Sequence, residues 1–438
     1  MMNIKAIKNV TIITMDKDKR IIENGVLIIE NNLVKDLGGQ ELLTKYIGAN
    51  VIDGNGGILM PGMINSHTHC SMIVFRSLAD DVPDRLNRFL FPLEKELVDK
   101  NLVYHGAKYG VAEMLLSGVT TFADMYFFED EVAKAAKEMG IRALLGETVL
   151  NFPSPDSAKA YGGIEYSEIF IKKWLGDELI TPMVAPHAPY SLDDKYLKAS
   201  YDMARKYDVP MMMHVAEMDY EVKKYRDEYN MTPIEYLDSI GVLGEHLIAA
   251  HCIHVSESDI DLLKKKKVGI SHNVGANSKA AKGVAPVVKM YKEGLDVGLG
   301  TDGPMSGNTL DIITQMGQVA KVHKLFNKDR SLFPASEIVE MATLGGAKAL
   351  KLDKRIGSIE IGKCADLVII ETDSVNMQPI YDYYSVLVYS ANPSNVDMVF
   401  VNGEILVRNK KLVNVDLKDL QNEVRKMNKK VSDIAKTL

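Results

Sequence analysis

Residues 57–69 read GILMPGMINSHTH, an apolar run that ends in two histidines, His67 and His69, two positions apart. In an extended strand, residues i and i+2 point to the same face, so both imidazoles would face one point. A pair of this kind in isolation is more typical of a polar loop than of a functional site. Its meaning therefore depends on what stands at the ends of the other strands.

Seven further short apolar runs follow this stretch along the chain. They are VTTFADM (119–125), IRALLGETV (141–149), ITPMVAPH (180–187), PMMMHVAE (210–217), LIAAHCIHV (247–255), VGISHNV (268–274) and DVGLGTDG (296–303). Amphipathic segments such as EDEVAKAAKEMG separate most of them, which indicates parallel βα units. Eight strands spread over about 250 residues predict a (β/α)8 barrel (a TIM barrel) rather than an open doubly wound sheet.

The two ends of the chain show short alternating strands punctuated by turns, at residues 3–55 and 356–415. The VNGE turn at 401–404 is a strong hairpin signal. Neither end has enough strands to bury a core alone, so we expect both to pair into one small β-sandwich beside the barrel. The predicted division is 1–56 for the first part of the sandwich, 57–352 for the barrel, and 353–438 for the second part with a C-terminal helix.

The composition limits the partners of the protein. The chain has 52 Lys and Arg against 59 Asp and Glu, a formal net charge of −7, and this balance offers no electrostatic footprint for nucleic acid. No apolar stretch reaches about 18 residues, the N-terminus lacks a signal-peptide pattern, and three cysteines are too few for a disulfide framework. We therefore expect a cytoplasmic protein that acts on a small-molecule substrate, binds neither nucleic acid nor membrane, and forms a homo-oligomer.

Side chains that suit a metal stand at the predicted strand ends. Five of the 10 histidines lie there with one glutamate and one aspartate: His67, His69, His187, His214, His251, Glu217 and Asp302. Imidazoles and carboxylates bind Zn²⁺ and related divalent ions, which lower the pKa of a bound water to about 7. We therefore predict hydrolysis, with Asp302 and His251 orienting or deprotonating the water and Glu217 shuttling a proton to the substrate. His187 either contacts the substrate or caps the following helix.

Seven stretches resemble the amidohydrolase superfamily, and in particular its metal-dependent deaminases of adenosine-like nucleosides, the methylthioadenosine and S-adenosylhomocysteine deaminases. The stretches occur in the family's order and span nearly the whole chain. They are PGMINSHTH (61–69), SGVTTFADM (117–125), APHAPYS (185–191), HVAEMDYEV (214–222), AAHCIHV (249–255), GTDGPMSGNTLD (300–311) and GSIEIGKCADLVII (357–370).

The resemblance implies a role for each matching residue. One divalent metal, Zn²⁺ in first place with Fe²⁺ or Mn²⁺ as alternatives, would be held by His67, His69, His214 and Asp302. Glu217 would donate a proton to a ring nitrogen, His251 would activate the water, and His187 would contact the base. Glu94, in FPLEKEL, matches a glutamate that binds the ribose hydroxyls. Glu147, in GETV, is the residue that could bridge a second metal, but a single metal is favoured.

Two places depart from the family's pattern. An arginine that approaches the amino-acid tail follows a Gly-Gly pair in the S-adenosylhomocysteine type, whereas Ile164 follows Gly162-Gly163 here. An aliphatic side chain cannot pair with a carboxylate as a guanidinium does, so we expect a less polar 5′ substituent such as 5′-deoxy or 5′-methylthio. Ala276 and Ala280 replace the family's serine and leucine, so the pocket floor is expected to differ.

The predicted reaction is hydrolytic deamination of an adenosine-like nucleoside to the inosine analogue and ammonia. One alternative directs the same chemistry at another amino-heterocycle, as in guanine, pterin or triazine aminohydrolases and chlorohydrolases. A second alternative is a barrel that has lost catalysis and serves as a scaffold. The presence of both Glu217 and Asp302 favours the aminohydrolase, and the filled ligand positions disfavour the scaffold.

Overall fold

In the computed structural model, which describes residues 4–438, the middle of the chain forms an eight-stranded parallel sheet. Its strands are β6 (Met63–Thr68), β7 (Val119–Tyr126), β8 (Arg142–Val149), β9 (Ile180–Pro186), β10 (Met211–Val215), β11 (Leu247–His251), β12 (Gly269–His272) and β13 (Val297–Leu299). They neighbour one another in chain order. The amides of Thr301 and Asp302, just past β13, donate to the His67 carbonyl at 3.1 and 3.0 Å, which brings the last strand back to the first. The predicted (β/α)8 barrel is confirmed.

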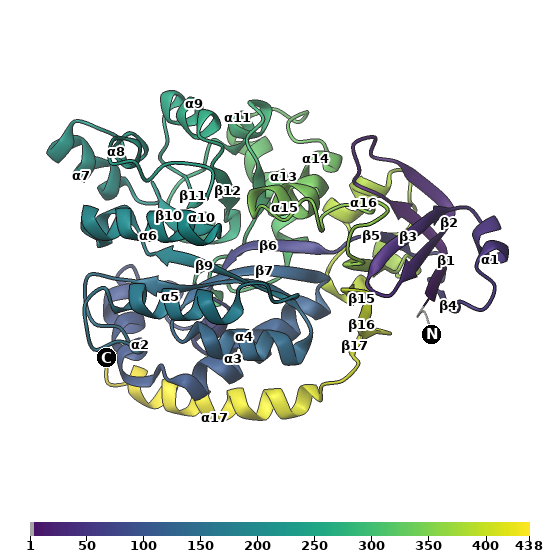
Figure 1. Ribbon diagram of the computed structural model, residues 1–438, viewed down its shortest axis with the longest axis horizontal. Helices are drawn as coiled ribbons and strands as arrows, with labels where there is room; N and C mark the ends of the chain where they lie inside the picture. The colour runs from purple at the N-terminus through teal and green to yellow at the C-terminus, as the bar shows by residue number, and fades with distance from the viewer. Residues whose placement is uncertain (1–3) are drawn as a thin grey trace.

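Helices cover the outside of this barrel (Figure 1). The regular ones are α2 (Phe91–Leu97), α3 (Lys100–Leu116), α4 (Glu129–Met139), α5 (Gly162–Trp174), α6 (Asp194–Tyr207), α7 (Asp219–Tyr229), α8 (Pro233–Ser239), α9 (Glu257–Lys265), α10 (Val274–Lys279), α11 (Val287–Lys292), α12 (Pro304–Gly307), α13 (Ile312–Asn327), α14 (Ala335–Glu340) and α15 (Gly346–Ala349). Helix α4 shows why they pack: its buried residues, among them Val132 and Ala136, recur at helical spacing. It ends where Gly140 adopts φ +79°, a left-handed conformation that glycine takes without strain.

Both ends of the chain contribute to a second, mixed sheet. Its strands run in the order β17 (Lys411–Leu412), β16 (Glu404–Arg408), β15 (Val396–Val401), β14 (Leu367–Ile370), β5 (Ile58–Pro61), β1 (Ile4–Ile13), β2 (Ile21–Glu30) and β3 (Leu33–Gly38), with β4 (Asn50–Asp53) also paired to β1. Leu27, Leu59, Leu367 and Phe400, from four of these strands, bury together in one apolar core. The expected pairing of the two chain ends is therefore confirmed. Asn402 and Gly403 make the predicted hairpin turn, with φ +51° and +75°.

The run 57–67 was expected to form one barrel strand, and this expectation is wrong. Strand β5 pairs with β1 and β14 in the small sheet, and only β6 belongs to the barrel. The division falls at Gly62, whose amide donates to the Asp366 carbonyl at 2.9 Å. A Cβ at Gly62 would lie 2.1 Å from Thr120 Oγ1, so only glycine lets the chain cross from one sheet to the other here.

A buried ion pair fixes the small sheet to the bottom of the barrel. Arg142, at the start of β8, donates from Nε and Nη2 to the two carboxylate oxygens of Asp366 at 2.8 and 3.2 Å. Its Nη1 donates to the Glu178 carbonyl, and the amide of Asn402 donates to Asp366 Oδ1. Both side chains are 2% exposed. The charges are thus paired and hydrogen-bonded, as burial requires.

The last helix, α17 (Leu417–Ala435), is the predicted C-terminal helix, and it runs along one side of the molecule from the small sheet across the barrel to α2 (Figure 1). Leu420, Val424, Met427 and Val431 form its buried stripe. The terminal segments also contain the helices α1 (Glu41–Lys45) and α16 (Tyr383–Tyr389). Among residues 4–438, no helix combines the length and the apolar character needed to cross a membrane.

Candidate active site

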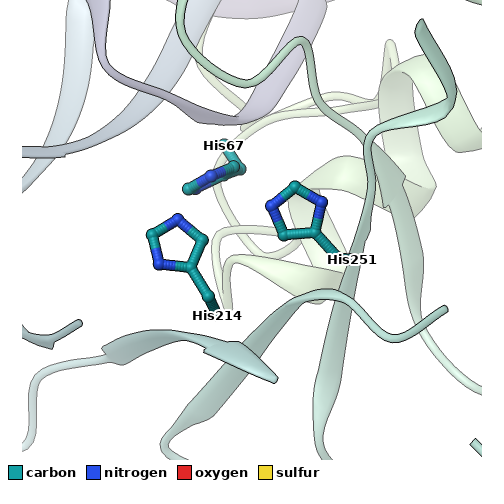
Figure 2. Close-up of side chains that lie close together, drawn as sticks. All are labelled: His67, His214 and His251. Atoms are coloured by element: carbon teal, nitrogen blue, oxygen red, sulfur yellow. The ribbon is translucent and has the colours of Figure 1, made fainter. Parts of the chain in front are cut away.

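The predicted site residues converge at the carboxyl ends of the barrel strands. His67 lies near the end of β6, His214 in β10 and His251 at the end of β11, while His69 precedes the short 3-10 helix η1 (Cys70–Phe75). Figure 2 shows the rings of His67, His214 and His251 turned toward one common space from separate strands. The centroid of the His67 ring lies 5.0 Å from that of His214 and 5.6 Å from that of His251.

Asp302 closes this group from the end of β13. Its Oδ1 lies 3.3 Å from His69 Nε2 and 3.9 Å from His67 Nε2. The possible ligand atoms form three groups, and within each group all atoms lie within 4.8 Å of one another. The groups are His67 with His214 and His251, His67 with His69 and Asp302, and Glu217 with His251 and Asp302. Atoms at this separation can share one ion at bond lengths of about 2.0–2.2 Å.

Hydrogen bonds to Nδ1 set the orientation of three imidazoles. His69 Nδ1 contacts the Met125 carbonyl, His214 Nδ1 the His187 carbonyl at 2.8 Å, and His251 Nδ1 the Asn277 side-chain oxygen at 2.8 Å. Each of these oxygens accepts a hydrogen bond, so Nδ1 carries the hydrogen, and Nε2 presents its lone pair whenever the ring is neutral. Metal-binding histidines are held in this way by outer partners.

Two buried nitrogens test whether the site fits a metal. Nε2 of His67 and Nε2 of His251 are buried and have no hydrogen-bond partner among the described residues. A buried polar atom without a partner costs about 1–3 kcal/mol, so its presence in a folded protein points to a ligand. Neutral nitrogens together with a carboxylate form the donor set that zinc prefers. The residues therefore fit a divalent metal.

Burial and close neighbours set the charges of these groups. Burial, together with the nearby His69 and His214, holds the pKa of His67 well below its usual range. Burial likewise lowers the pKa of His214, with His187 adding to the effect. Burial would also lower the pKa of His69, but Asp302 outweighs it and raises that pKa to about 9. His67 and His214 are therefore neutral, as metal binding requires, whereas His69 has to release a proton when it binds a metal.

Glu217 stands two residues past the end of β10 and faces His251, with 3.7 Å between its Oε1 and His251 Nε2. Burial would raise the pKa of its carboxyl, but His251, Lys282 and His214 outweigh burial, and the pKa falls to about 2. The backbone amides of Ala216 and Glu217 both donate to the buried carboxylate of Glu221 at 3.0 Å. Glu217 is thus an ionised carboxylate on a fixed backbone.

The residues expected to bind substrate border the same space. The His187 ring centroid lies 4.9 Å from that of His214, and burial lowers the pKa of His187 to about 4. Its Nδ1 lies 3.1 Å from Ser191 Oγ, four residues along the chain. Glu94, on α2, accepts a 2.7 Å hydrogen bond from the Tyr126 hydroxyl, and the Tyr126 ring lies 6.3 Å from that of His69. Both residues therefore lie close to the histidines.

Three other residues singled out by the sequence lie apart from the ligand sets. Ile164 is half-buried in the first turn of α5 and packs on the main core. Ala276 is buried in α10. Glu147, in β8, accepts from the amide of Glu129 and belongs to none of the metal-ligating groups among residues 4–438.

Several residues at the site were not predicted. Tyr126 is the last residue of β7, so the strand-end argument that selected the histidines could also have found it. Asn277, in α10, orients His251 through its side-chain oxygen. Lys282 contacts Glu217 Oε1 from a position 65 residues further along the chain, and no local pattern reports such a contact.

An eight-stranded parallel barrel with histidines and carboxylates gathered at its carboxyl end defines a class of metal-dependent hydrolases. The sequence pattern of the Amidohydrolase family matches residues 58–406, and the chain belongs to this family.

Relatives of known name are similar over nearly the whole chain. The chain is 40% identical over 397 residues to the 5-methylthioadenosine/S-adenosylhomocysteine deaminase of Thermodesulfovibrio yellowstonii, covering 90% of each protein. It is 37% identical over 403 residues to the 5'-deoxyadenosine deaminase of Methanosarcina mazei, covering 91% of each. The crystal structure of an adenosine deaminase from Xanthomonas campestris with bound zinc superposes with a TM-score of 0.96 at 29% identity and 98% coverage of both chains.

Proposed function

We propose that this protein is a metal-dependent hydrolytic deaminase of an adenosine-like nucleoside, which it converts to the inosine analogue and ammonia. The observation that carries the proposal is the buried centre in which His67 Nε2 and His251 Nε2 have no hydrogen-bond partner among residues 4–438, while Glu217 and Asp302 face them. The deaminase relatives, similar over about nine-tenths of the chain, supply the reaction class.

We propose His67, His69, His214 and Asp302 as the ligands of one divalent ion, with zinc in first place. The zinc bound by the Xanthomonas relative and the nitrogen-rich donor set support this choice. When bound, such an ion supplies a water whose pKa is lowered to about 7.

The chain's own residues then move the protons. Glu217 begins as a carboxylate, so it can accept a proton from the attacking water and deliver it to a ring nitrogen. His251, with its hydrogen fixed on Nδ1 by Asn277, offers the lone pair of Nε2 to the same water. Protonation of the ring nitrogen lets the amine-bearing carbon become tetrahedral. The second proton of the water, taken up by His251, then moves to the amino group, which leaves as ammonia.

The substrate contacts are assigned on position and on the family resemblance. We propose that Glu94 binds the ribose hydroxyls and that His187 contacts the base, since both border the histidine group. Ile164 in place of an arginine supports a preference for 5′-deoxy or 5′-methylthio nucleosides over S-adenosylhomocysteine. The alternative substrate class is another amino-heterocycle, such as guanine or an aminotriazine.

The test is ammonia release by the zinc-loaded protein. The panel contains adenosine, 5′-deoxyadenosine, 5′-methylthioadenosine, S-adenosylhomocysteine, guanine and an aminotriazine. We expect turnover of the nucleosides, with the 5′-deoxy and 5′-methylthio compounds ahead of S-adenosylhomocysteine. Glu217→Gln is expected to lower kcat by about 10²–10⁴-fold while metal content stays unchanged. Turnover of the triazine or guanine alone would overturn the nucleoside assignment.

We also propose that the enzyme works in the cytoplasm and as a homo-oligomer. Cys70, Cys252 and Cys364 are all buried free thiols, which suits a reducing compartment.

Leu325 and Phe326, at the end of α13, expose 81% and 64% of their surface, and such apolar groups favour association. Sedimentation of wild type and a Leu325→Lys/Phe326→Lys variant tests this: a monomeric wild type would refute the homo-oligomer.

A further inference from the structure

A lysine outside the proposed catalytic set contacts the proposed proton shuttle. Lys282 lies on the turn between α10 and α11, and its ammonium donates to Oε1 of Glu217. The two side chains are only 13% and 14% exposed, so water competes weakly for this pair. It therefore differs from the exposed ion pairs on the outer helices, which contribute little.

The turn that carries Lys282 is itself well fixed. The amide of Lys282 donates to the Asn277 carbonyl at 3.0 Å, and Gly283 follows with φ +122°. A Cβ at Gly283 would lie 3.0 Å from Ile253 Cγ2, which shows how closely the turn packs against the segment after β11. One short segment thus supports two site residues, with Asn277 on His251 and Lys282 on Glu217.

The contact leaves a defined part of Glu217 free. Its backbone is held by Glu221, whose carboxylate accepts hydrogen bonds from the amides of Ala216 and Glu217. Both side-chain contacts, to Lys282 and to His251, use Oε1. A glutamate side chain has several rotatable bonds, and fixing them before the substrate arrives removes an entropic cost from the reaction.

We infer that Lys282 is a positioning residue for the proposed deamination: its ammonium holds Oε1 of Glu217, so that Oε2 is directed at the substrate ring nitrogen. The inference rests on the proposed function, in which Glu217 moves the proton. It makes Lys282 neither a metal ligand nor a substrate anchor. Its loss should therefore affect turnover rather than binding.

Lys282→Met tests the role of the charge, because methionine keeps the length of the side chain and removes the ammonium. We expect kcat to fall by about 10- to 100-fold, with KM and metal content close to wild type. Lys282→Arg, which keeps a cation, should recover most of kcat. Lys282→Gln is a second uncharged variant, expected to lose kcat in the same direction, and it replaces the methionine variant if that one does not fold.

Two controls separate positioning from a general effect. Lys289→Met removes a neighbouring lysine on α11 whose partner, Glu257, is exposed, and it should leave kcat unchanged. In a Glu217→Gln background, Lys282→Met should cause no further loss, because the two residues act through one carboxylate. An equal loss in both backgrounds would overturn the inference. So would a wild-type kcat in Lys282→Met, or a raised kcat, which would make the pair a contact that turnover must break.

A separate measurement distinguishes this inference from the proposed function. If wild type releases no ammonia from any compound of the panel, the deaminase proposal fails regardless of Lys282. The pairing itself is then tested by thermal unfolding: Lys282→Met should lower Tm in the wild-type background and leave Tm unchanged in Glu217→Gln. Identical shifts in both backgrounds would show that Lys282 does not act on Glu217.

Discussion

The two ends of the barrel differ in whether their buried polar groups have hydrogen-bond partners. At the bottom, Arg142 donates two hydrogen bonds to Asp366. Arg142 also donates to the Glu178 carbonyl, and Asp366 also accepts from the amide of Asn402. At the top, His67 and His251 are as deeply buried, yet Nε2 of each has no partner within residues 4–438. The bottom is complete without a ligand, whereas the top has atoms available for one.

This difference separates residues that hold the fold from residues that perform chemistry. A buried charge that is paired mainly holds the small sheet on the barrel. Removal of one partner leaves the other charge buried and unpaired. An unpartnered imidazole weakens the fold unless a ligand completes it. Substitutions at the bottom should therefore change stability, and substitutions at the top should change metal content and turnover.

His214→Ala should have the largest effect on function. It removes one of the three proposed ligand nitrogens, so we expect metal content near background and a kcat reduced by more than about 100-fold, beyond the usual cost of an outer partner. Elemental analysis and ammonia release measure both. His246→Ala, which removes a histidine bonded to the Val209 carbonyl before β11, should leave both values unchanged. A fully metal-loaded, active His214→Ala would contradict the assignment.

Arg142→Met should have the largest effect on stability. It leaves Asp366 buried without its cation, which we expect to lower the free energy of unfolding by about 3–5 kcal/mol. Denaturant titration measures this, with Lys426→Met as the control: Lys426 pairs with Glu423 at the surface and should contribute about 0–1 kcal/mol. The kcat per folded molecule should stay at the wild-type value. A large loss of kcat with normal stability would remove the distinction between the two ends.

Asn277→Ala should have a smaller effect at the top. Without the amide oxygen, His251 can place its hydrogen on either nitrogen, so we expect kcat to fall by about 10- to 100-fold with metal content retained. Asn277→Asp keeps an acceptor at the same atom and should recover activity. Equal activity in the alanine and aspartate variants would show that the hydrogen bond does not orient His251.

Glu94 gives an effect of another kind, a pH dependence of stability. Burial raises the pKa of Glu94 from 4.5 to about 7, while the Tyr126 hydroxyl and His69 act in the opposite direction. Between these two values the folded chain keeps a proton that the unfolded chain has released, so stability falls as pH rises from about 4.5 to about 7 and then levels off. Glu94→Gln should lack this fall. Parallel pH profiles of unfolding free energy for the two proteins would disprove it.

Much of this arrangement could be predicted from local sequence. The apolar runs located the barrel strands, and the residues after them located His67, His214, His251, Glu217 and Asp302. The C-terminal helix was also predictable, because its apolar residues recur at helical spacing over 417–435. In each case a short stretch contains the whole signal.

Features that depend on distant contacts could not be predicted. The chain changes sheets at Gly62, which packs against Thr120, 58 residues away, and an apolar run looks the same in either sheet. Strand alternation predicted that the rings of His67 and His69 face the same side. His69 lies beyond the end of the strand, at the start of η1, so its backbone does not follow this alternation strictly. The pairing of Lys282 with Glu217 likewise arises from two loops that only the closed barrel brings together.

The most direct test of the central claim follows one turnover in oxygen-18-labelled water. Zinc-loaded protein is given 5′-methylthioadenosine, and the product is analysed by mass spectrometry together with released ammonia. The account predicts one ammonia per product and one labelled oxygen at the carbon that carried the amine. An unchanged nucleoside, or a product that retains its amine nitrogen, would contradict hydrolytic deamination at this centre.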